Sequence, residues 1–422
     1  MKLTSVKGMH DVGPAEIGLW HRVEKTARTI FENANFSELR TPPLEDEALF
    51  TRGIGSTTDI IEKEMYAFED RKGRKLALRP EGTASVVRSY IEHYVGKGEY
   101  DRFYYMGPMF RYERPQKGRY RQFYQIGAEV FAAQSSKVDA EVISLAYEIF
   151  KQLGLQKVIL NINSLGCNEC RPAYRKELVE FLTPLLPELC EDCQKRTSRN
   201  PLRVLDCKKE KCIELTQAAP GMFESLCEVC VSHFEGVQQG LRKLGIPYEV
   251  NPRMVRGLDY YVRTAFEFLS GDLGAQNAVA GGGRYDGLVK DLGGPAVPGI
   301  GFAIGMERLV SLLQGQGLRP AERPKIFLAC LGEAAQAWGL EAQSQFRRQG
   351  FQTISNFDSS SLKTLLKQAD KLKADYALIL GDNELQSRKV QIKEMKSGAD
   401  QKEIPLDSVI AYFENLFPST SR

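Results

Sequence analysis

The chain has 422 residues, of which 57 are Lys or Arg and 54 are Asp or Glu, so its formal net charge is only +3. This length predicts about two or three domains, and the near balance of charge excludes RNA binding through overall charge, so that any RNA contact must depend on local patches. No window approaches the ~18 uninterrupted apolar residues of a membrane-spanning helix, and no secretory signal is visible, so we expect a cytoplasmic protein.

Residues 1–165 are expected to form helices and antiparallel hairpins. An amphipathic helix is expected from about Ile17 to Phe31, and a hairpin at Tyr66–Leu78. Further helices are expected from Gly82 into Tyr94 and over Asp139–Leu153. Separate runs of hairpins and helices indicate an α+β core around an antiparallel sheet.

Residues 166–246 are rich in Cys, Glu and Lys, with helical spacing and few strand signals, and we interpret them as a helical insertion. The core continues over residues 247–314. Residues 315–325 are Gly/Pro-rich and charged, which predicts a linker. In residues 326–422 strands alternate with helices, which predicts a small α/β domain with a largely parallel sheet.

The most informative stretch runs from Tyr105 to Phe131. Strands are expected into Phe110 and from Gln122, and Pro115 and Gly118 mark the loop between them. The loop is dense in cations: Arg111, Arg114, Lys117, Arg119 and Arg121. Guanidinium groups stay charged and pair with phosphate oxygens two at a time. We therefore predict that the hairpin holds a polyanion, the alternative being a solvated cationic loop.

Five stretches together resemble the histidyl-tRNA synthetases, which are class II aminoacyl-tRNA synthetases. FRYER in the hairpin is similar to motif 2, GFAIGMERL (Gly301–Leu309) to motif 3, and Phe31–Phe50, with its Pro42, to motif 1. RGLDYY (Arg256–Tyr261) and AGGGRYDG (Ala280–Gly287) resemble the two histidine-specific stretches, which narrow the resemblance from the class to histidine. The resemblance covers essentially the whole chain.

The resemblance implies that ATP with Mg²⁺ activates L-histidine to histidyl-adenylate, which is transferred to the 3′ end of histidine tRNA by a homodimer. It implies a class II antiparallel-sheet core, with the C-terminal α/β domain binding the anticodon. A carboxylate that attacks the α-phosphorus of ATP needs fixed cations rather than a strong base. The resemblance assigns catalysis to Arg256, Arg111 and Arg308. The ATP-binding residues that it implies are Arg111, Arg119, Arg121 and Arg308.

Histidine is implied to bind at Glu81, Gly82, Thr83, Gln125, Glu129, Tyr260, Tyr261 and Tyr285. Glu129 and Tyr261 are the implied imidazole partners, which would use both hydrogen-bonding positions of the ring, whereas Tyr260 is alternatively a packing aromatic. The three glycines before Arg284 permit close backbone approach to a ligand. In the hairpin loop, Arg114 and Gln116 are implied to contact the acceptor end of the tRNA.

Eight of the nine cysteines lie between Cys167 and Cys230. They form the pairs Cys167/Cys170, Cys190/Cys193, Cys207/Cys212 and Cys227/Cys230. Disulfides are disfavoured in the cytosol, and repeated C-x-x-C is the ligand spacing of structural zinc. We therefore hypothesise at least one structural zinc site, the alternative being free thiols in helices. The sequence does not say which pairs would meet.

The alternative function is that of a regulatory relative, since some chains similar to these synthetases are regulatory subunits of histidine biosynthesis. Such a chain is expected to lack the C-terminal domain and to have altered RGLDYY or motif 3 arginines, whereas this chain retains all of them. A different class II synthetase is the nearest enzymatic alternative, and RGLDYY argues against it.

Overall fold

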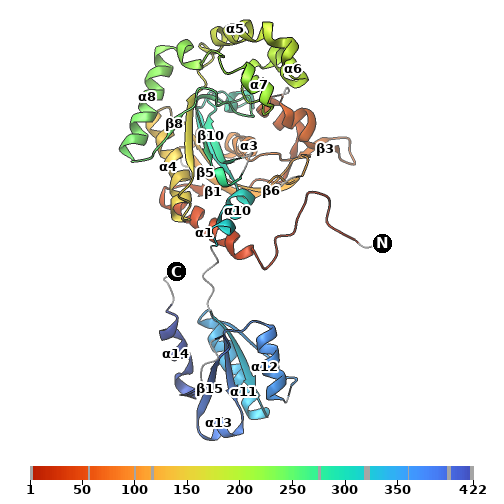
Figure 1. Ribbon diagram of the computed structural model, residues 1–422, viewed down its shortest axis with the longest axis vertical. Helices are drawn as coiled ribbons and strands as arrows, with labels where there is room; N and C mark the ends of the chain where they lie inside the picture. Colours follow the sequence, from red (N-terminus) through yellow and green to blue (C-terminus); the bar gives the residue numbers. More distant parts are fainter. Residues whose placement is uncertain are drawn as a thin grey trace. The chain divides into compact units, whose positions relative to one another are not determined.

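The computed structural model describes residues 3–55, 58–98, 101–115, 118–273, 277–317, 324–359, 361–396 and 401–418. The chain divides into two compact units, Met1–Arg319 and Pro320–Arg422 (Figure 1). Among the described residues, no helix combines the length and apolar character that a membrane crossing requires.

An eight-stranded sheet forms the centre of the larger unit. Its strands are β1 (Ser37–Glu38), β5 (Arg102–Phe110), β6 (Gln122–Phe131), β7 (Ile159–Ser164), β8 (Glu249–Val250), β9 (Val262–Leu269), β10 (Ala278–Arg284) and β11 (Gly299–Gly305). Their order is β1-β5-β6-β11-β10-β9-β7-β8. In this order, every pair of neighbours between β5 and β7 is antiparallel. The pairs at the two edges, β1–β5 and β7–β8, are parallel. The predicted antiparallel-sheet core is confirmed.

Successive residues of a strand point to opposite faces of the sheet. Both faces of this sheet carry apolar side chains, and helices cover both. The helices of the first face are α1 (Ile17–Asn33), α4 (Ser136–Gln152) and α10 (Met306–Gly315). They share one apolar core with Tyr104 of β5. The neighbouring Phe103 instead packs with Tyr90 of α3 (Thr83–His93) and with Tyr285 on the opposite face. The second face carries the candidate site.

A smaller antiparallel sheet begins within the motif 1 segment and ends before α3. Its strands are β2 (Leu44–Asp46), β3 (Tyr66–Glu69) and β4 (Lys75–Leu78), with β4 in the middle. Helix α2 (Glu47–Ile54) follows β2 directly, and the Asp46 side chain caps it by accepting a hydrogen bond from the Ala48 N–H at 2.8 Å.

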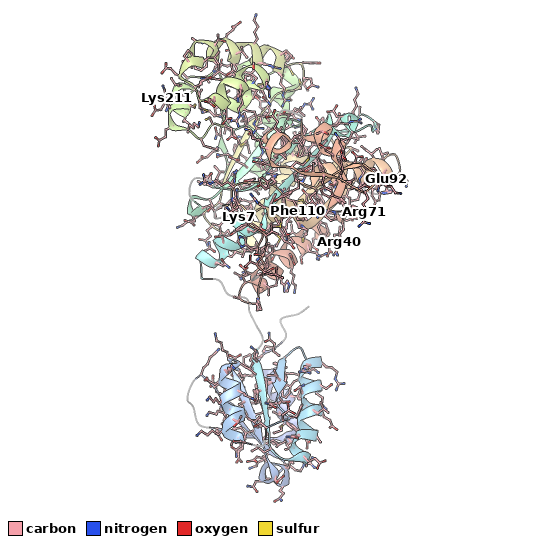
Figure 2. The ribbon with its side chains drawn as sticks, turned by 90° about the vertical axis from the view of Figure 1, so that its right-hand side faces the viewer. Lys7, Arg40, Arg71, Glu92, Phe110 and Lys211 are labelled. Atoms are coloured by element: carbon pink, nitrogen blue, oxygen red, sulfur yellow. The ribbon has the colours of Figure 1, made fainter. Side chains whose placement is uncertain are left out.

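The insertion is helical and has a core of its own. Its α-helices are α5 (Arg171–Leu182), α6 (Glu191–Arg199), α7 (Glu210–Leu215) and α8 (Glu228–Lys243). Tyr174, Leu178 and Leu182 of α5 pack in this core together with buried cysteines. Helix α8 packs against α4, whereas α5, α6 and α7 gather at the end of the unit (Figure 1). In Figure 2, Lys211 projects from the outer side of the insertion, whereas Phe110 lies in the body of the unit.

The smaller unit is an α/β domain with a mixed sheet. Its strands are β12 (Lys325–Cys330), β13 (Gln352–Ser355), β14 (Tyr376–Leu380), β15 (Lys389–Glu394) and β16 (Lys402–Pro405). Its helices are α11 (Glu333–Arg348), α12 (Leu362–Lys371), α13 (Asp382–Gln386) and α14 (Val409–Leu416). The expectation of a largely parallel sheet was wrong for its second half, because β14–β15 and β15–β16 are antiparallel. Only residues 381–388 join β14 to β15, fewer than the ~12 residues that a parallel crossover needs.

Candidate active site

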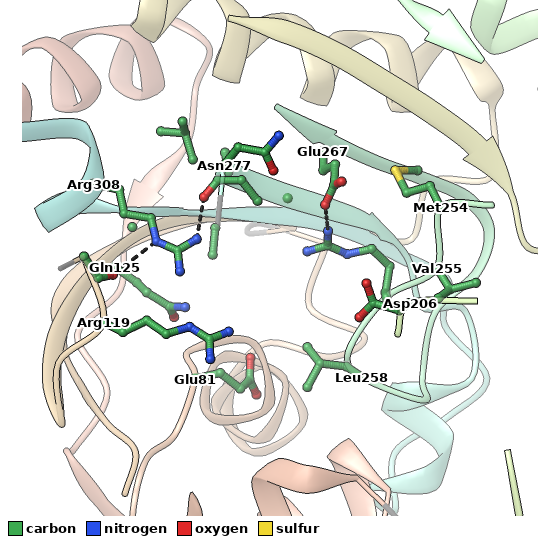
Figure 3. A pocket seen from close by; sticks show the side chains of 18 of the residues that line it. Glu81, Arg119, Gln125, Asp206, Met254, Val255, Leu258, Glu267, Asn277 and Arg308 are labelled. Carbon is green, nitrogen blue, oxygen red and sulfur yellow. Dashed lines mark hydrogen bonds and ion pairs between the residues drawn. The ribbon is translucent and has the colours of Figure 1, made fainter. Parts of the chain in front are cut away.

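A cavity of about 560 Å³ lies on the second face of the central sheet, within the usual range of small-molecule sites. The structure brings together there these predicted site residues: Glu81, Thr83, Arg111, Arg119, Gln125, Arg256, Tyr260, Tyr261 and Arg308. Figure 3 shows Arg119 and Arg308 on one side and Met254, Val255 and Leu258 on the other. Segments far apart in the sequence therefore form one site.

The first turn of α3 fixes the floor of the cavity. The Glu81 carboxylate accepts hydrogen bonds from the N–H groups of Thr83 at 2.7 Å and Ala84 at 2.8 Å, so it satisfies two free donors at the start of the helix. Burial raises the pKa of Glu81, although these two bonds oppose the shift. The neighbouring Gly82 has no side chain to offer: a Cβ there would lie 2.2 Å from the Tyr105 ring. Gly82 thus provides space for Tyr105, a buried residue that sequence reasoning missed.

Glu129 of β6 is completely buried and does not line the cavity. The Thr83 hydroxyl donates to its Oε1 at 2.7 Å, and the Tyr285 hydroxyl donates to its Oε2 at 2.5 Å. Burial raises the pKa of Glu129 to about 8, so the protonated form is favoured at pH 7. A Cβ at position 301 would lie 1.7 Å from this carboxylate, which explains Gly301 in motif 3. Thr83, which does line the cavity, connects Glu129 to it.

Arg308 of α10 and the hairpin arginines concentrate positive charge at one end of the cavity. Arg308 donates from Nε to the Gly118 carbonyl at 3.2 Å and from Nη1 to the Ala278 carbonyl at 2.5 Å. Burial lowers the pKa of Arg308, and the charges of Arg119 and Arg111 lower it further. Arg308 therefore experiences repulsion from these two charges, which the nearby carboxylates of Glu113 and Glu307 offset in part. A polyanion between the three guanidinium groups would relieve this repulsion.

Arg111 is anchored through one nitrogen. Its Nε donates to the Pro80 carbonyl at 2.8 Å, and its guanidinium carbon lies 5.2 Å from the centroid of the Phe123 ring. Arg119 forms an ion pair with Glu113 at 3.0 Å. Both guanidinium groups therefore have fixed positions on the cavity wall while keeping further N–H donors.

Arg256 precedes β9, and its side chain lies against Gly281 of β10. Its Nη1 forms an ion pair with Glu267 at 3.1 Å, and its guanidinium carbon lies 5.7 Å from the Tyr261 ring centroid. A Cβ at Gly281 would lie 2.2 Å from Nη2 of Arg256. We expected the glycines to permit close approach of a ligand; at Gly281 the structure shows that the space accommodates this arginine, and Gly281 also lines the cavity.

Several cavity residues carry buried polar atoms without a hydrogen-bond partner in the described part of the chain. These atoms are Gln125 Oε1, Arg256 Nε and the Tyr260 hydroxyl oxygen. Native structures satisfy most buried polar atoms, so three such atoms at one cavity are typical of a site built for a polar ligand.

Among the described residues, five of those predicted to bind histidine, ATP or tRNA do not line the cavity: Gly82, Arg114, Arg121, Glu129 and Tyr285. The guanidinium carbon of Arg121 lies 3.8 Å from the Tyr112 ring centroid, and its Nε donates to the Glu113 carbonyl at 3.3 Å, outside the cavity lining. Arg114 is exposed. Gln116 lies outside the described residues. The ATP role of Arg121 and the tRNA roles of Arg114 and Gln116 stay predictions.

A buried ion-pair cluster behind the site also escaped sequence reasoning. Arg284 and Asp139 are fully buried and meet at 2.6 Å, and His233 of the insertion lies 2.8 Å from the same carboxylate. Arg284 precedes Tyr285, so the cluster fixes the residue that holds Glu129. An acidic residue on the apolar face of α4, with Val142 and Ile143, is the one signal that could have indicated it.

Comparison with known proteins identifies the family of the chain. The family model described as Histidyl-tRNA synthetase matches residues 8–309, and the Anticodon binding domain model matches residues 325–416. The histidine–tRNA ligases of Trichlorobacter lovleyi and Geobacter sulfurreducens are 53% and 51% identical to the chain, over 95% and 96% of its length and 96% and 97% of theirs. The crystal structure of apo S. aureus histidyl-tRNA synthetase matches with a TM-score of 0.80 at 35% identity, over 98% of this chain and 100% of that one.

These findings confirm the resemblance drawn from the motifs. The regulatory alternative is less supported for two reasons. The matches to these ligases extend over nearly the full length of both chains, and the C-terminal unit matches the anticodon-binding model. Histidine, ATP and tRNA are the substrates that the family implies. The chain therefore belongs to the histidyl-tRNA synthetase family, and its function is to activate histidine with ATP and join it to tRNA.

Proposed function

We propose that histidyl-adenylate forms in the cavity on the second face of the sheet, with its parts held at two ends. The phosphate end consists of Arg111, Arg119 and Arg308. The histidine end consists of Glu81, Thr83, Gln125, Tyr260 and Tyr261, with Glu129 and Tyr285 behind it. The observation that carries this proposal is the convergence of Arg111, Arg119 and Arg308 on one cavity that the histidine-end residues also line.

At the phosphate end, cations replace a general base. The histidine carboxylate is already ionised when it approaches the α-phosphorus, so the barrier is the accumulation of negative charge. Arg111 and Arg308 are each anchored to backbone carbonyls, so their remaining N–H groups are preorganised for phosphate oxygens. Arg256 would act at the junction of the two ends, where its pairing with Glu267 and its position beside Tyr261 bring it near the reacting carboxylate.

At the histidine end, carboxyl and phenol groups would recognise the substrate. Glu81, Thr83 and Gln125 suit the α-amino group because they offer oxygen acceptors at the cavity. Tyr261 lines the cavity and suits one ring nitrogen, and Glu129, directly behind Thr83, is proposed for the other. Tyr285 and Thr83 hold Glu129 from two sides, so Tyr285 would position the carboxyl rather than touch the substrate.

Mg²⁺ would enter with ATP. This ion prefers carboxylate oxygens and usually bridges them to phosphates. The carboxylates Glu113 and Glu307 line the cavity beside the arginines and fit this chemistry. Bound there, Mg²⁺ would neutralise part of the charge of the triphosphate. In the insertion, we propose at least one structural zinc ion, because its cysteines lie in groups with suitable ligand spacing.

We further propose a two-fold homodimer that uses the motif 1 region around Pro42. Leu44 of β2 and Phe68 of β3 are exposed on the small sheet that follows this region, and apolar groups there suit a self-complementary contact. Sedimentation at low micromolar concentration should show a dimer, and a fully active monomer would contradict it. The C-terminal unit is proposed to bind the anticodon.

Replacing Arg256 tests the proposed placement. Arg256→Ala should reduce ATP–pyrophosphate exchange on the order of 10²-fold or more, because it removes charge stabilisation in the transition state. Histidine binding measured by calorimetry without ATP should change much less. Arg88→Ala is the control, since Arg88 forms an ion pair with Glu45 at 2.6 Å but does not line the cavity. Unchanged exchange in Arg256→Ala would refute the placement.

A further inference from the structure

The cysteines of the insertion meet in two separate groups of four. The outer quartet consists of Cys167, Cys170, Cys227 and Cys230, and the inner quartet of Cys190, Cys193, Cys207 and Cys212. We propose that each quartet binds one Zn²⁺ ion, and that the two ions hold the wall of the active-site cavity in place. The second half of this proposal rests on the proposed placement of the substrates.

The sulfur geometry fits zinc. Four thiolates around zinc at ~2.3 Å place the sulfurs about 3.8 Å apart. The Sγ atom of Cys167 lies 3.6 Å from that of Cys170 and 3.9 Å from that of Cys227, and the Sγ atoms of Cys190 and Cys207 lie 4.0 Å apart. In each quartet all four sulfurs lie within 4.8 Å of one another. The cysteines are free thiols, so the short distances are not disulfides.

Backbone amides already support this arrangement. The N–H of Cys227 donates to Cys170 Sγ at 3.1 Å, and the N–H of Cys190 donates to Cys212 Sγ at 3.4 Å. Such donors stabilise the thiolate form that binds a metal and orient the ligand. Four sulfur ligands with no water complete a closed tetrahedral site, which is typical of structural zinc and leaves no position for catalysis.

Helix α6 and the 3-10 helix before it bury few side chains, although Leu189, Val204 and Leu205 beside them pack into the core of the insertion. The only buried residues of α6 are Cys193 and Thr197. The 3-10 helix Thr183–Glu188 before it has no buried residue. Helices that bury so few apolar side chains are commonly held in place by a metal or by disulfides. Zinc in the inner quartet would supply that constraint where the apolar contacts do not.

The residues between the cysteines contact the histidine-specific segment. Asn200 Nδ2 donates to Asp259 at 2.7 Å, and Arg203 Nη1 donates to the Gly257 carbonyl at 3.1 Å. Both donors lie between Cys193 and Cys207. Asp259 and Gly257 belong to RGLDYY, the stretch that carries Arg256. The inner quartet thus braces the backbone that positions this arginine.

Further contacts start next to the other ligands. Arg253 donates from Nη2 to the Thr216 hydroxyl at 2.8 Å, and this hydroxyl donates to the Cys212 carbonyl at 2.8 Å. Arg171, which follows Cys170, donates to the carbonyl of Tyr261. Both quartets are therefore joined to residues 253–261 through short chains of hydrogen bonds.

The inner quartet also borders the cavity itself. Asp206, Cys207 and Lys208 line the cavity together with Met254 and Val255, and Figure 3 shows Asp206 on the same side as Val255 and Leu258. Loss of the inner zinc ion should therefore disturb substrate binding, although the ion lies outside the reaction. Loss of the outer ion should act more weakly, through Arg171.

Metal content tests the first half of the proposal. Elemental analysis of the reduced full chain should find two zinc ions per chain, and one in each of Cys230→Ser and Cys212→Ser. Cys330→Ser is the control, because Cys330 is a buried thiol of the C-terminal unit outside both quartets, and it should retain two. Titrating wild-type protein with a mercurial should release both ions with about eight thiols, which needs no variant to fold. Absence of zinc even after incubation with Zn²⁺ alone, or iron in its place, would overturn the assignment.

Exchange kinetics test the second half. Cys212→Ser should raise the KM for histidine and ATP by about tenfold while kcat changes less, and Cys230→Ser should have a smaller effect. Equal kinetics in Cys212→Ser and Cys330→Ser, with one zinc ion lost from the former, would show that the ion does not hold the cavity wall. Arg256→Ala should keep both ions, so a failure of the proposed substrate placement would appear in that variant with its zinc content intact.

Discussion

The two ends of the cavity are built from opposite kinds of side chain. At the histidine end, Glu129 is completely buried and accepts hydrogen bonds from Thr83 and Tyr285. At the phosphate end, Arg119 is partly exposed, and Arg308 lies near the charges of Arg119 and Arg111. One end therefore places a protonatable acid where water is excluded, and the other places permanent charges where an anion can enter.

This difference follows from what each end must do. Selecting histidine requires hydrogen-bonding groups that lose much free energy when the wrong side chain leaves them unpaired, which needs burial. Stabilising phosphoryl transfer requires charge fixed before the reaction. If this comparison is correct, changes at the histidine end should act on histidine binding, and changes at the phosphate end on the chemical step.

The largest expected effect on histidine binding comes from Glu129→Gln. Glutamine replaces one of the two carboxyl oxygens by an amide nitrogen that can only donate, so the hydroxyl of Thr83 or Tyr285 beside it must turn to accept, and the imidazole loses its carboxyl group. We expect histidine affinity to fall on the order of 10²-fold by calorimetry without ATP. ATP binding should be nearly unchanged. If histidine bound normally to this variant, the assignment of the histidine end would be wrong.

A smaller effect is expected from Tyr285→Phe. This change removes one donor to Glu129, and because that hydrogen bond lowers the pKa of Glu129, its loss should raise the pKa further. Histidine affinity should fall by about five- to tenfold, corresponding to about 1 kcal/mol for one hydrogen bond. Tyr147→Phe is a matched control, since Tyr147 packs against the core on the first face of the sheet. Equal affinities in the two variants would remove Tyr285 from the site.

The smallest expected effect is on stability. Burial raises the pKa of Glu129 from an ordinary value near 4.5 to about 8. Between these values the folded protein holds a proton that the unfolded chain releases, so this group's contribution to stability falls as the pH rises. Glu129→Gln should lack that contribution. As the pH rises from about 5 to about 9, the melting temperature of the variant without ligands should therefore increase by a few degrees relative to that of the wild type. Parallel pH profiles would contradict the buried, protonated carboxyl.

The sequence predicted those parts of the site that local patterns encode. The hairpin strands alternate apolar residues around a polar loop, and β5 and β6 follow that pattern. Arg111, Arg256 and Arg308 stand among apolar or glycine residues, where a merely solvated arginine is unusual, and all three line the cavity. Helices α1 and α4 follow apolar spacing.

The sequence did not predict contacts between distant segments. No pattern in the neighbouring sequence indicates that Asp139 contacts Arg284. The grouping of the cysteines is also hidden, because the first and last pairs along the chain form one quartet and the two pairs between them form the other. The direction of a side chain in a polar loop is equally hidden, as Arg121 over the Tyr112 ring shows. Tyr105 was missed because its role depends on the space left by Gly82 and Gly127 on other segments.

The division of labour between the two ends can be tested by one crossed measurement. Histidine affinity without ATP and the single-turnover rate of adenylate formation at saturating histidine would be measured in Glu129→Gln and Arg256→Ala. Glu129→Gln should lose mainly affinity, and Arg256→Ala mainly rate, each by on the order of 10²-fold. Equal losses of affinity and rate in both variants would contradict the account, because they would show that the cavity acts as one undivided site.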